Sequence, residues 1–90
     1  MKIGTREIGK GNPAYIIAEM SANHAGDIVR AKEIIHMAKE AGADCVKIQT
    51  YTPDTLTIDC DNSYFHISDG TWNGENLYQL YQKAYTPWEW

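Results

Sequence analysis

The chain has 90 residues, of which 43% are hydrophobic, 22% are charged and 11% are aromatic, and its formal net charge is −4. A chain of this length forms one domain at most and buries only about 60–65% of the surface that its unfolded form exposes, so we expect a thin core. The negative charge and the lack of a Lys/Arg cluster argue against a nucleic-acid surface. No stretch approaches the ~20 apolar residues of a membrane span, and the first residues lack the apolar region of a signal peptide.

The cysteine content is low. Cys45 and Cys60 are too few to staple a secreted mini-protein, and they form no CxxC pair of the kind that binds zinc or carries redox chemistry. We therefore expect reduced thiols in a cytoplasmic protein.

Two strand candidates open the chain. Residues 2–9 alternate weakly between apolar and polar and are bounded by Gly4 and Gly9, which predicts a short strand or a hairpin. Residues 14–19 form an apolar run of strand formers that contains no charged residue before Glu19. This second pattern predicts a strand that is buried on both faces, as in a parallel sheet.

Residues 27–41 have the pattern of an amphipathic helix. Asp27 is a suitable N-cap, and Gly42 follows the last apolar position, where a left-handed C-terminal cap is expected. Residues 45–50 are a further strand candidate. Strand, helix, tight turn and strand together predict a βαβ unit with a parallel pair, so the fold class is α/β. The apolar face of the helix comprises Ile28, Ala31, Ile34, Ile35, Ala38 and Ala41.

The second half of the chain is less regular. Residues 51–75 are rich in turn formers, which is typical of a functional or mobile connection. A second helix is expected to start near Glu75 or Asn76 and to end at Thr86-Pro87. Two strands and two helices do not complete a core, and Trp88 and Trp90 have no following strand to bury them. We therefore interpret the chain as an incomplete opening segment of a larger α/β domain.

Polar residues occupy the ends of the two main strands, where parallel α/β folds bind their ligands. Glu19 closes the first strand, and Lys47 and Gln49 lie late in the second, on one face because strand side chains alternate. We expect a carboxylate, an ammonium group and an amide at a common mouth. Two interpretations stay open: a shared polar site, or a structural ion pair between Glu19 and Lys47.

The loop after the first main strand is a further candidate. It carries Asn23 and His24 between a strand and a helix, which is a usual place for binding groups. Both residues also serve turns, and a lone His is more often a hydrogen-bonded turn residue than a metal ligand. His36 and His66 show no ligand spacing with His24, so we expect no metal site in this segment.

Four segments resemble the sialic acid synthase family: IIAEMSANHAG at residues 16–26, AGADCVKIQT at 41–50, YTPDTLT at 51–57 and YTPWEW at 85–90. Together they span nearly the whole chain, and the SANHAG and QTYTPD runs look most like the pseudaminic acid branch. The resemblance implies the first two strands and helices of a (β/α)₈ TIM barrel, which needs about 250 residues. The rest of the barrel, and a small C-terminal domain that reaches the active site of the partner in a homodimer, would lie beyond Trp90.

The family resemblance also implies a reaction. It is the condensation of phosphoenolpyruvate with the open-chain aldehyde of an N-acetylated amino sugar, with release of phosphate. In the pseudaminic acid branch the sugar is a 2,4-diacetamido-2,4,6-trideoxy hexose. A divalent cation, Mn or Mg, polarises the aldehyde oxygen. Its ligands are expected beyond Trp90, so the 90-residue segment alone should be inactive.

Residue roles are carried over by the same resemblance. Lys47 matches the lysine that holds phosphoenolpyruvate, and Gln49 would line the same pocket. Glu19 matches an acidic residue near the aldehyde, and we expect it to transfer a proton or orient water. Asn23 and His24 would shape the mouth of the site.

Trp72 and Asn73 lie where the family's loop approaches the N-acetyl group of the sugar, and they are the remaining substrate-binding candidates. Two alternatives remain. The first alternative is a fragment of a synthase for N-acetylneuraminate or a legionaminic-type acid. The second is a non-enzymatic α/β module for binding or assembly.

Overall fold

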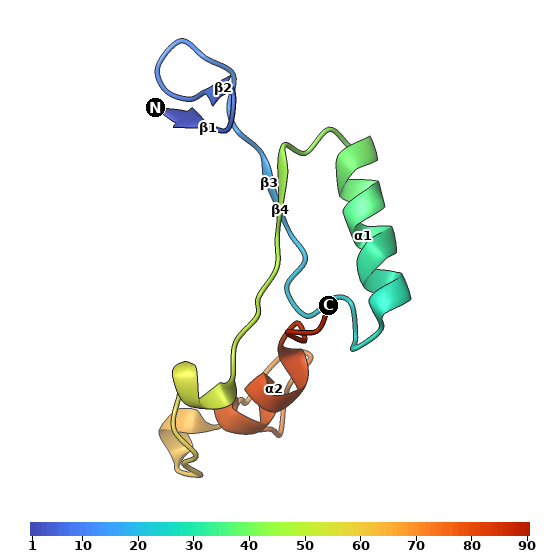
Figure 1. The fold of residues 1–90 in the computed structure, drawn as a ribbon. Coiled ribbons are helices and arrows are strands. Elements are labelled where there is room, and N and C mark those ends of the chain that lie inside the picture. Colours follow the sequence, from blue (N-terminus) through green and yellow to red (C-terminus); the bar gives the residue numbers. More distant parts are fainter.

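The computed structural model describes all 90 residues, and its strands form two separate pairs (Figure 1). Strands β1 (Lys2–Ile3) and β2 (Arg6–Glu7) make an antiparallel hairpin, as predicted. Gly4 has a φ of 58°, the left-handed conformation that a two-residue hairpin turn needs. Strands β3 (Ile17–Glu19) and β4 (Cys45–Lys47) pair in parallel, which confirms the α/β class, although both strands are shorter than the predicted runs.

Helix α1 (Ile28–Glu40) connects β3 to β4 and has both of its predicted caps. The Asp27 carboxylate accepts a hydrogen bond of 2.8 Å from the amide of Val29. At the other end Gly42 has a φ of 88°, and its amide donates to the Lys39 carbonyl over 3.0 Å. This left-handed cap turns the chain directly into β4.

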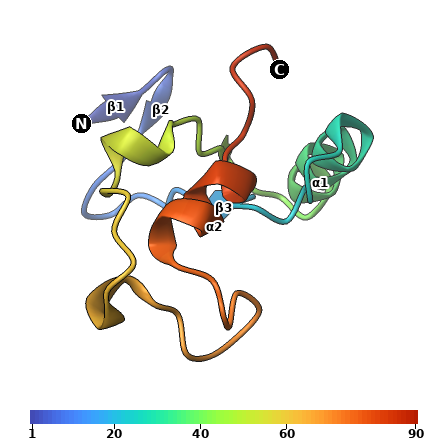
Figure 2. The ribbon, with the colours of Figure 1, turned by 90° about the horizontal axis from the view of Figure 1, so that it is seen from below.

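Beyond β4 the chain forms two 3₁₀ turns, η1 (Pro53–Thr55) and η2 (Ser63–Phe65), and then helix α2 (Leu77–Ala84). The predicted second helix is confirmed, and Asn76 and Gln79 cap it reciprocally. These elements lie beyond the carboxyl ends of β3 and β4 (Figure 1), and in the view from below α2 lies in front of β3 (Figure 2).

The parallel pair is poorly covered. Ile16 and Ile17 keep 54% and 50% of their surface exposed, and only six of the 90 residues are buried. The prediction of a strand buried on both faces is therefore wrong for this chain, because two strands and one flanking helix leave the other face open. The radius of gyration, 16.5 Å, exceeds the ~12 Å of a compact domain of this length.

The small core lies where β3 ends and α1 begins. Met20, His24 and Ala31 retain 2%, 0% and 4% of their exposure there. The C-terminal segment returns to this place, so that the chain end lies near the first turn of α1 (Figure 1). Thr86 in that segment is 2% exposed. The core therefore supports the carboxyl end of the sheet, where the candidate site residues lie.

No helix of the structure combines the length and the apolar character that crossing a membrane requires.

Candidate functional site

Glu19 and Lys47 lie side by side at the carboxyl ends of β3 and β4. They are register partners in the parallel pair, which places both side chains on one face of the sheet. The Lys47 ammonium donates to a Glu19 carboxylate oxygen over 2.8 Å, and the side chains are 49% and 62% exposed. The ion pair that the sequence left open is thus present. An exposed pair of this kind contributes at most about 1 kcal/mol to stability. A stabilising role therefore explains little of its presence.

Gln49 lies two residues beyond the end of β4 and is half-buried. Its carbonyl accepts a hydrogen bond of 2.7 Å from the amide of Thr86. Its side chain makes no hydrogen bond within the chain, so its amide group remains available to a ligand. The backbone around Gln49 is therefore fixed, while its polar end is not.

The loop between β3 and α1 has a strained backbone. Ser21 and Ala25 adopt φ angles of 50° and 51°, and Gly26 follows with 74°. For a non-glycine residue this conformation costs about 1–2 kcal/mol. Such strain persists only where the surroundings enforce it, and it clusters at functional sites. The sequence gives no signal for it, because neither Ser nor Ala favours a positive φ.

His24 supports this loop from inside. Its Nδ1 accepts a hydrogen bond of 3.0 Å from the amide of Gly26, and its Nε2 lies 3.4 Å from the hydroxyl of Thr86. The ring of Trp90 meets it edge-on, with the ring centroids 5.1 Å apart. Burial lowers the pKa of His24 below its ordinary value. The histidine is therefore neutral at pH 7 and acts as a hydrogen-bonded turn residue.

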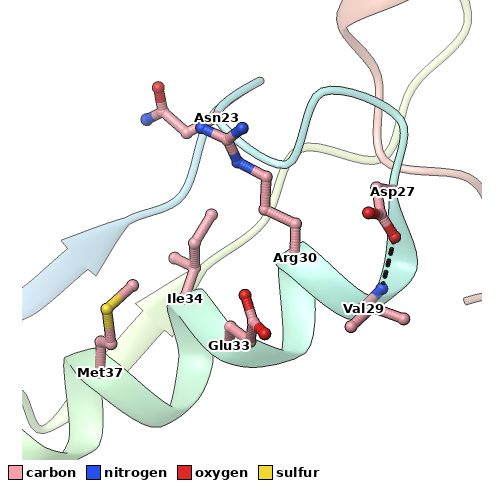
Figure 3. Close-up of a pocket in the computed structure, with 7 residues that line it drawn as sticks. All are labelled: Asn23, Asp27, Val29, Arg30, Glu33, Ile34 and Met37. Atoms are coloured by element: carbon pink, nitrogen blue, oxygen red, sulfur yellow. Dashed lines mark hydrogen bonds between the residues drawn. The ribbon is translucent and has the colours of Figure 1, made fainter.

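Asn23 points outward from the same loop. Its side chain borders an open cavity of about 550 Å³ on the flank of α1, and Arg30 extends toward it from the helix (Figure 3). Neither Glu19 nor Lys47 lines this cavity. The largest hollow of the chain is therefore separate from the ion pair at the strand ends.

Trp72 and Asn73 lie in a different turn. Asn73 donates its amide to the Gly70 carbonyl over 3.2 Å, and Trp72 accepts from Glu75 over 3.1 Å. The backbone hydrogen bonds of this turn join residues 67–75, the Glu75 carboxylate accepts from Lys83 of α2, and no hydrogen bond of the turn reaches β3 or β4. The structure thus brings Glu19, Lys47, Gln49 and the loop of Asn23 and His24 to one end of the sheet, but it does not join this turn to them by hydrogen bonds.

Two tyrosines near α2 have shifted pKa values. The hydrogen bond that Tyr78 donates to Asp54 over 3.1 Å raises the pKa of the phenol. Burial raises the pKa of Tyr51, and the neighbouring Tyr81 adds to the effect. Tyr78 joins α2 to η1, and Tyr51 packs edge-on against Tyr81 of α2, so both shifts belong to the packing around α2.

No three His, Cys, Asp or Glu side chains of the chain gather in a way that would hold a metal ion. His24 does not add a free ligand, because both of its ring nitrogens already have partners.

The sequence analysis missed two residues that organise the site and its support. One is Thr86, described above. The other is Asp44, whose carboxylate pairs with Arg6 and accepts from the amide of Ile16 over 2.8 Å. Asp44 thereby ties the hairpin to the amino end of the sheet. These contacts join residues 28 to 62 positions apart, so no local pattern could reveal them.

Comparison with known proteins gives a consistent group of relatives. The model of the NeuB family matches residues 34–90. A pseudaminic acid synthase of Campylobacter jejuni is 51% identical over 90 residues, which are 100% of this chain and 26% of the relative. A pseudaminic acid synthase of Helicobacter pylori is 54% identical over 78 residues, which are 87% of this chain and 23% of the relative.

An N,N'-diacetyllegionaminic acid synthase of Legionella pneumophila is 49% identical over 53 residues, covering 59% of this chain and 15% of the relative. The chain spans 26% of the length of the first relative that it matches.

Proposed function

This chain belongs to the NeuB family, and from that premise we propose that it is the N-terminal part of a synthase that condenses phosphoenolpyruvate with an N-acetylated amino sugar. Pseudaminic acid synthases of two bacteria match 100% and 87% of the chain at 51% and 54% identity. We therefore propose pseudaminic acid and phosphate as the products, and a 2,4-diacetamido-2,4,6-trideoxy hexose as the sugar. The full-length parent would be a (β/α)₈ barrel, acting as a homodimer in the cytoplasm.

The exposed pair of Lys47 and Glu19 is the observation that carries this proposal. The pair lies at the carboxyl ends of adjacent parallel strands, where α/β barrels bind substrates. The ammonium group of Lys47 is a point charge suited to a phosphate or carboxylate. Because an exposed ion pair is weak, an incoming anion can take the place of Glu19 beside Lys47 at low cost.

Displacement by phosphoenolpyruvate would also free the carboxylate of Glu19. A carboxylate beside the reacting aldehyde can transfer a proton or orient water. Gln49 adds an amide with no partner inside the chain, and Asn23 adds another from the neighbouring loop. In this proposal Lys47 and Gln49 bind the phosphoenolpyruvate side, Glu19 serves the chemistry, and Asn23 borders the mouth. Trp72 and Asn73 remain candidates for contact with the N-acetyl group.

We further propose a Mn²⁺ or Mg²⁺ requirement for the parent. When bound, such an ion would polarise the aldehyde oxygen. The residues of this chain do not provide a ligand set for it, so we place its ligands beyond residue 90 and derive no step through it.

The open surface of the chain supports its role as part of a larger barrel. Ile16 and Ile17 are half-exposed, so part of the sheet has no neighbouring element to cover it. The large radius of gyration likewise indicates an open arrangement of the elements. We therefore propose that residues 1–90 alone have no synthase activity.

The test is phosphate release by the full-length parent, supplied with phosphoenolpyruvate, Mn²⁺ and one of two sugars. Release with the 6-deoxy diacetamido sugar and not with N-acetylmannosamine is expected. Preference for N-acetylmannosamine would keep the chemistry and change the product to N-acetylneuraminate. Release with neither sugar would overturn the proposed reaction.

A legionaminic-type synthase is the second candidate, because the Legionella relative keeps 49% identity over 53 residues of this chain. It uses the same chemistry on a different diacetamido sugar, so a third arm of the assay with that stereoisomer separates the two. A non-enzymatic binding module is the candidate from another class. Cooperative unfolding of the isolated 90-residue chain as a monomer would favour it.

A further inference from the structure

We propose that His24, Thr86 and the carbonyl of Gln49 form a clasp that positions the two candidate substrate segments at the ends of β3 and β4. Its effect on catalysis rests on the proposed function, whereas its geometry does not. In this proposal Thr86 and His24 are positioning residues, because neither has an exposed polar group at the candidate site.

Thr86 is the centre of the clasp because it holds both segments at once. Its amide donates to the Gln49 carbonyl over 2.7 Å, and its hydroxyl lies 3.4 Å from Nε2 of His24. Gln49 follows β4, and His24 stands in the loop that follows β3. A single residue from a third segment thus fixes the distance between the chain segments that carry the Gln49 and Asn23 amides.

The hydrogen bonds of the clasp require one tautomer of His24. Nδ1 accepts from the amide of Gly26, so it carries no proton. The proton of the neutral ring is therefore on Nε2, which donates it to the hydroxyl of Thr86. The same accepting Nδ1 also holds the left-handed residues Ala25 and Gly26 in place. The ring thus enforces the strained backbone of the loop while it anchors the loop to Thr86.

The side chains around Thr86 favour the hydrogen-bonded arrangement of the clasp. Met20, Ile48 and Trp90 are among the side chains that line a small cavity of about 110 Å³ beside Thr86. A hydroxyl group that lost His24 would face mainly apolar neighbours there, and an unmade hydrogen bond in such a place is costly. The clasp is therefore held closed by the environment as well as by its own hydrogen bonds.

The experiment compares Thr86→Val with Thr86→Ser in the full-length parent. Valine keeps the shape and the backbone amide but removes the hydroxyl, so kcat should fall about tenfold as the two segments lose their alignment. Serine restores the hydroxyl and should restore most of kcat. Thr5→Val makes the same change in the exposed hairpin turn and is the matched control.

A second readout does not depend on activity. In the parent labelled with ¹⁵N-histidine, His24 should show a neutral ring with its proton on Nε2 at pH 7. A ring that is charged, or protonated on Nδ1, would overturn the clasp. So would equal kcat values for Thr86→Val and Thr86→Ser, since a purely steric role would not distinguish them. A parent that releases no phosphate with any sugar would instead refute the proposed function, and the tautomer would still decide the clasp.

Discussion

At the scale of single residues, the proposed role of Lys47 in binding an anion can be tested separately from its contribution to folding stability. Its ammonium group is about half exposed and has one exposed partner, Glu19. Replacing it therefore removes little folding free energy, at most about 1 kcal/mol. A charge-assisted contact with a bound anion is stronger, about 1.5–3 kcal/mol. The two effects are therefore separable by experiment.

Lys47→Ala in the full-length parent should raise KM for phosphoenolpyruvate about tenfold or more, because the anion loses its point charge. The melting temperature should change little. Steady-state phosphate release and thermal unfolding measure the two quantities. Lys10→Ala, an exposed loop substitution outside the site, is the control. Unchanged KM and kcat in Lys47→Ala would refute the assignment.

His24 gives a prediction about pH. An unfolded histidine binds its proton near pH 6.5, whereas burial lowers the pKa of His24 in the folded chain. Below about pH 6.5 the unfolded state therefore binds more protons than the folded state, and acid favours unfolding. The contribution of neutral His24 to stability is complete above pH 6.5 and is lost as the pH falls through its lowered pKa.

Urea unfolding of the parent at several values between pH 8 and pH 5 measures this loss. The variant His24→Gln cannot titrate, so it should show a smaller decrease in unfolding free energy over the same range. His36→Gln changes an exposed helix position and should keep the decrease of the wild type. Identical pH dependence in His24→Gln and the wild type would contradict the buried, neutral state.

At the scale of elements, the hairpin is held to the sheet through Asp44. The Asp44 carboxylate pairs with Arg6, and its second oxygen accepts from the Ile16 amide over 2.8 Å. The Arg6 guanidinium also lies over the ring of Tyr15, 5.6 Å from its centroid. This anchor is at the amino end of β4, opposite to Lys47.

Asp44→Ala should lower the unfolding free energy of the parent by about 1–3 kcal/mol, since it leaves the Arg6 and Ile16 donors without their acceptor. Arg6→Ala should cost less, because Asp44 still accepts from Ile16. Chemical denaturation measures both values. The kcat of Asp44→Ala should stay near the wild-type value, and a large drop in kcat without loss of stability would contradict this division between the two ends.

Elements with local signals could be predicted from the sequence. The helix predicted at residues 27–41 agrees with α1 within one residue at each end, and Asn76 marks the start of α2. The placement of Glu19 beside Lys47 also follows from strand alternation and parallel pairing. Thr86 and Asp44 could not be predicted, because their roles depend on partners that are distant along the chain. The prediction that the first main strand is buried on both faces was wrong. An apolar run shows that a strand can be buried, but it does not show whether neighbouring elements are present to bury it.

At the scale of the whole molecule, the parallel pair has free edges and exposed apolar side chains. Ile16, Ile17 and Ile48 each keep half or more of their exposure. Unpaired strand edges and contiguous apolar surface promote association with other chains. The isolated 90-residue chain should therefore associate, or unfold without a sharp transition.

Light scattering and urea unfolding of the isolated chain test this expectation, with the full-length parent as the control. The parent should remain dispersed and unfold at higher urea concentration. A monodisperse 90-residue monomer with a sharp unfolding transition would contradict the incomplete-barrel interpretation and favour the independent binding module.

The long sequence separation within the clasp has a consequence for biosynthesis. His24 and Thr86 are 62 residues apart, so at roughly 5–20 residues per second the ribosome makes Thr86 about 3–12 s after His24. Strand β3 precedes His24, and helix α1 and strand β4 are synthesised within that interval. The nascent chain thus has a complete βαβ unit for several seconds before the segment that aligns its carboxyl end has been translated. A slow codon between residues 50 and 85 would lengthen that interval, in which the strained loop of residues 21–26 lacks its partner.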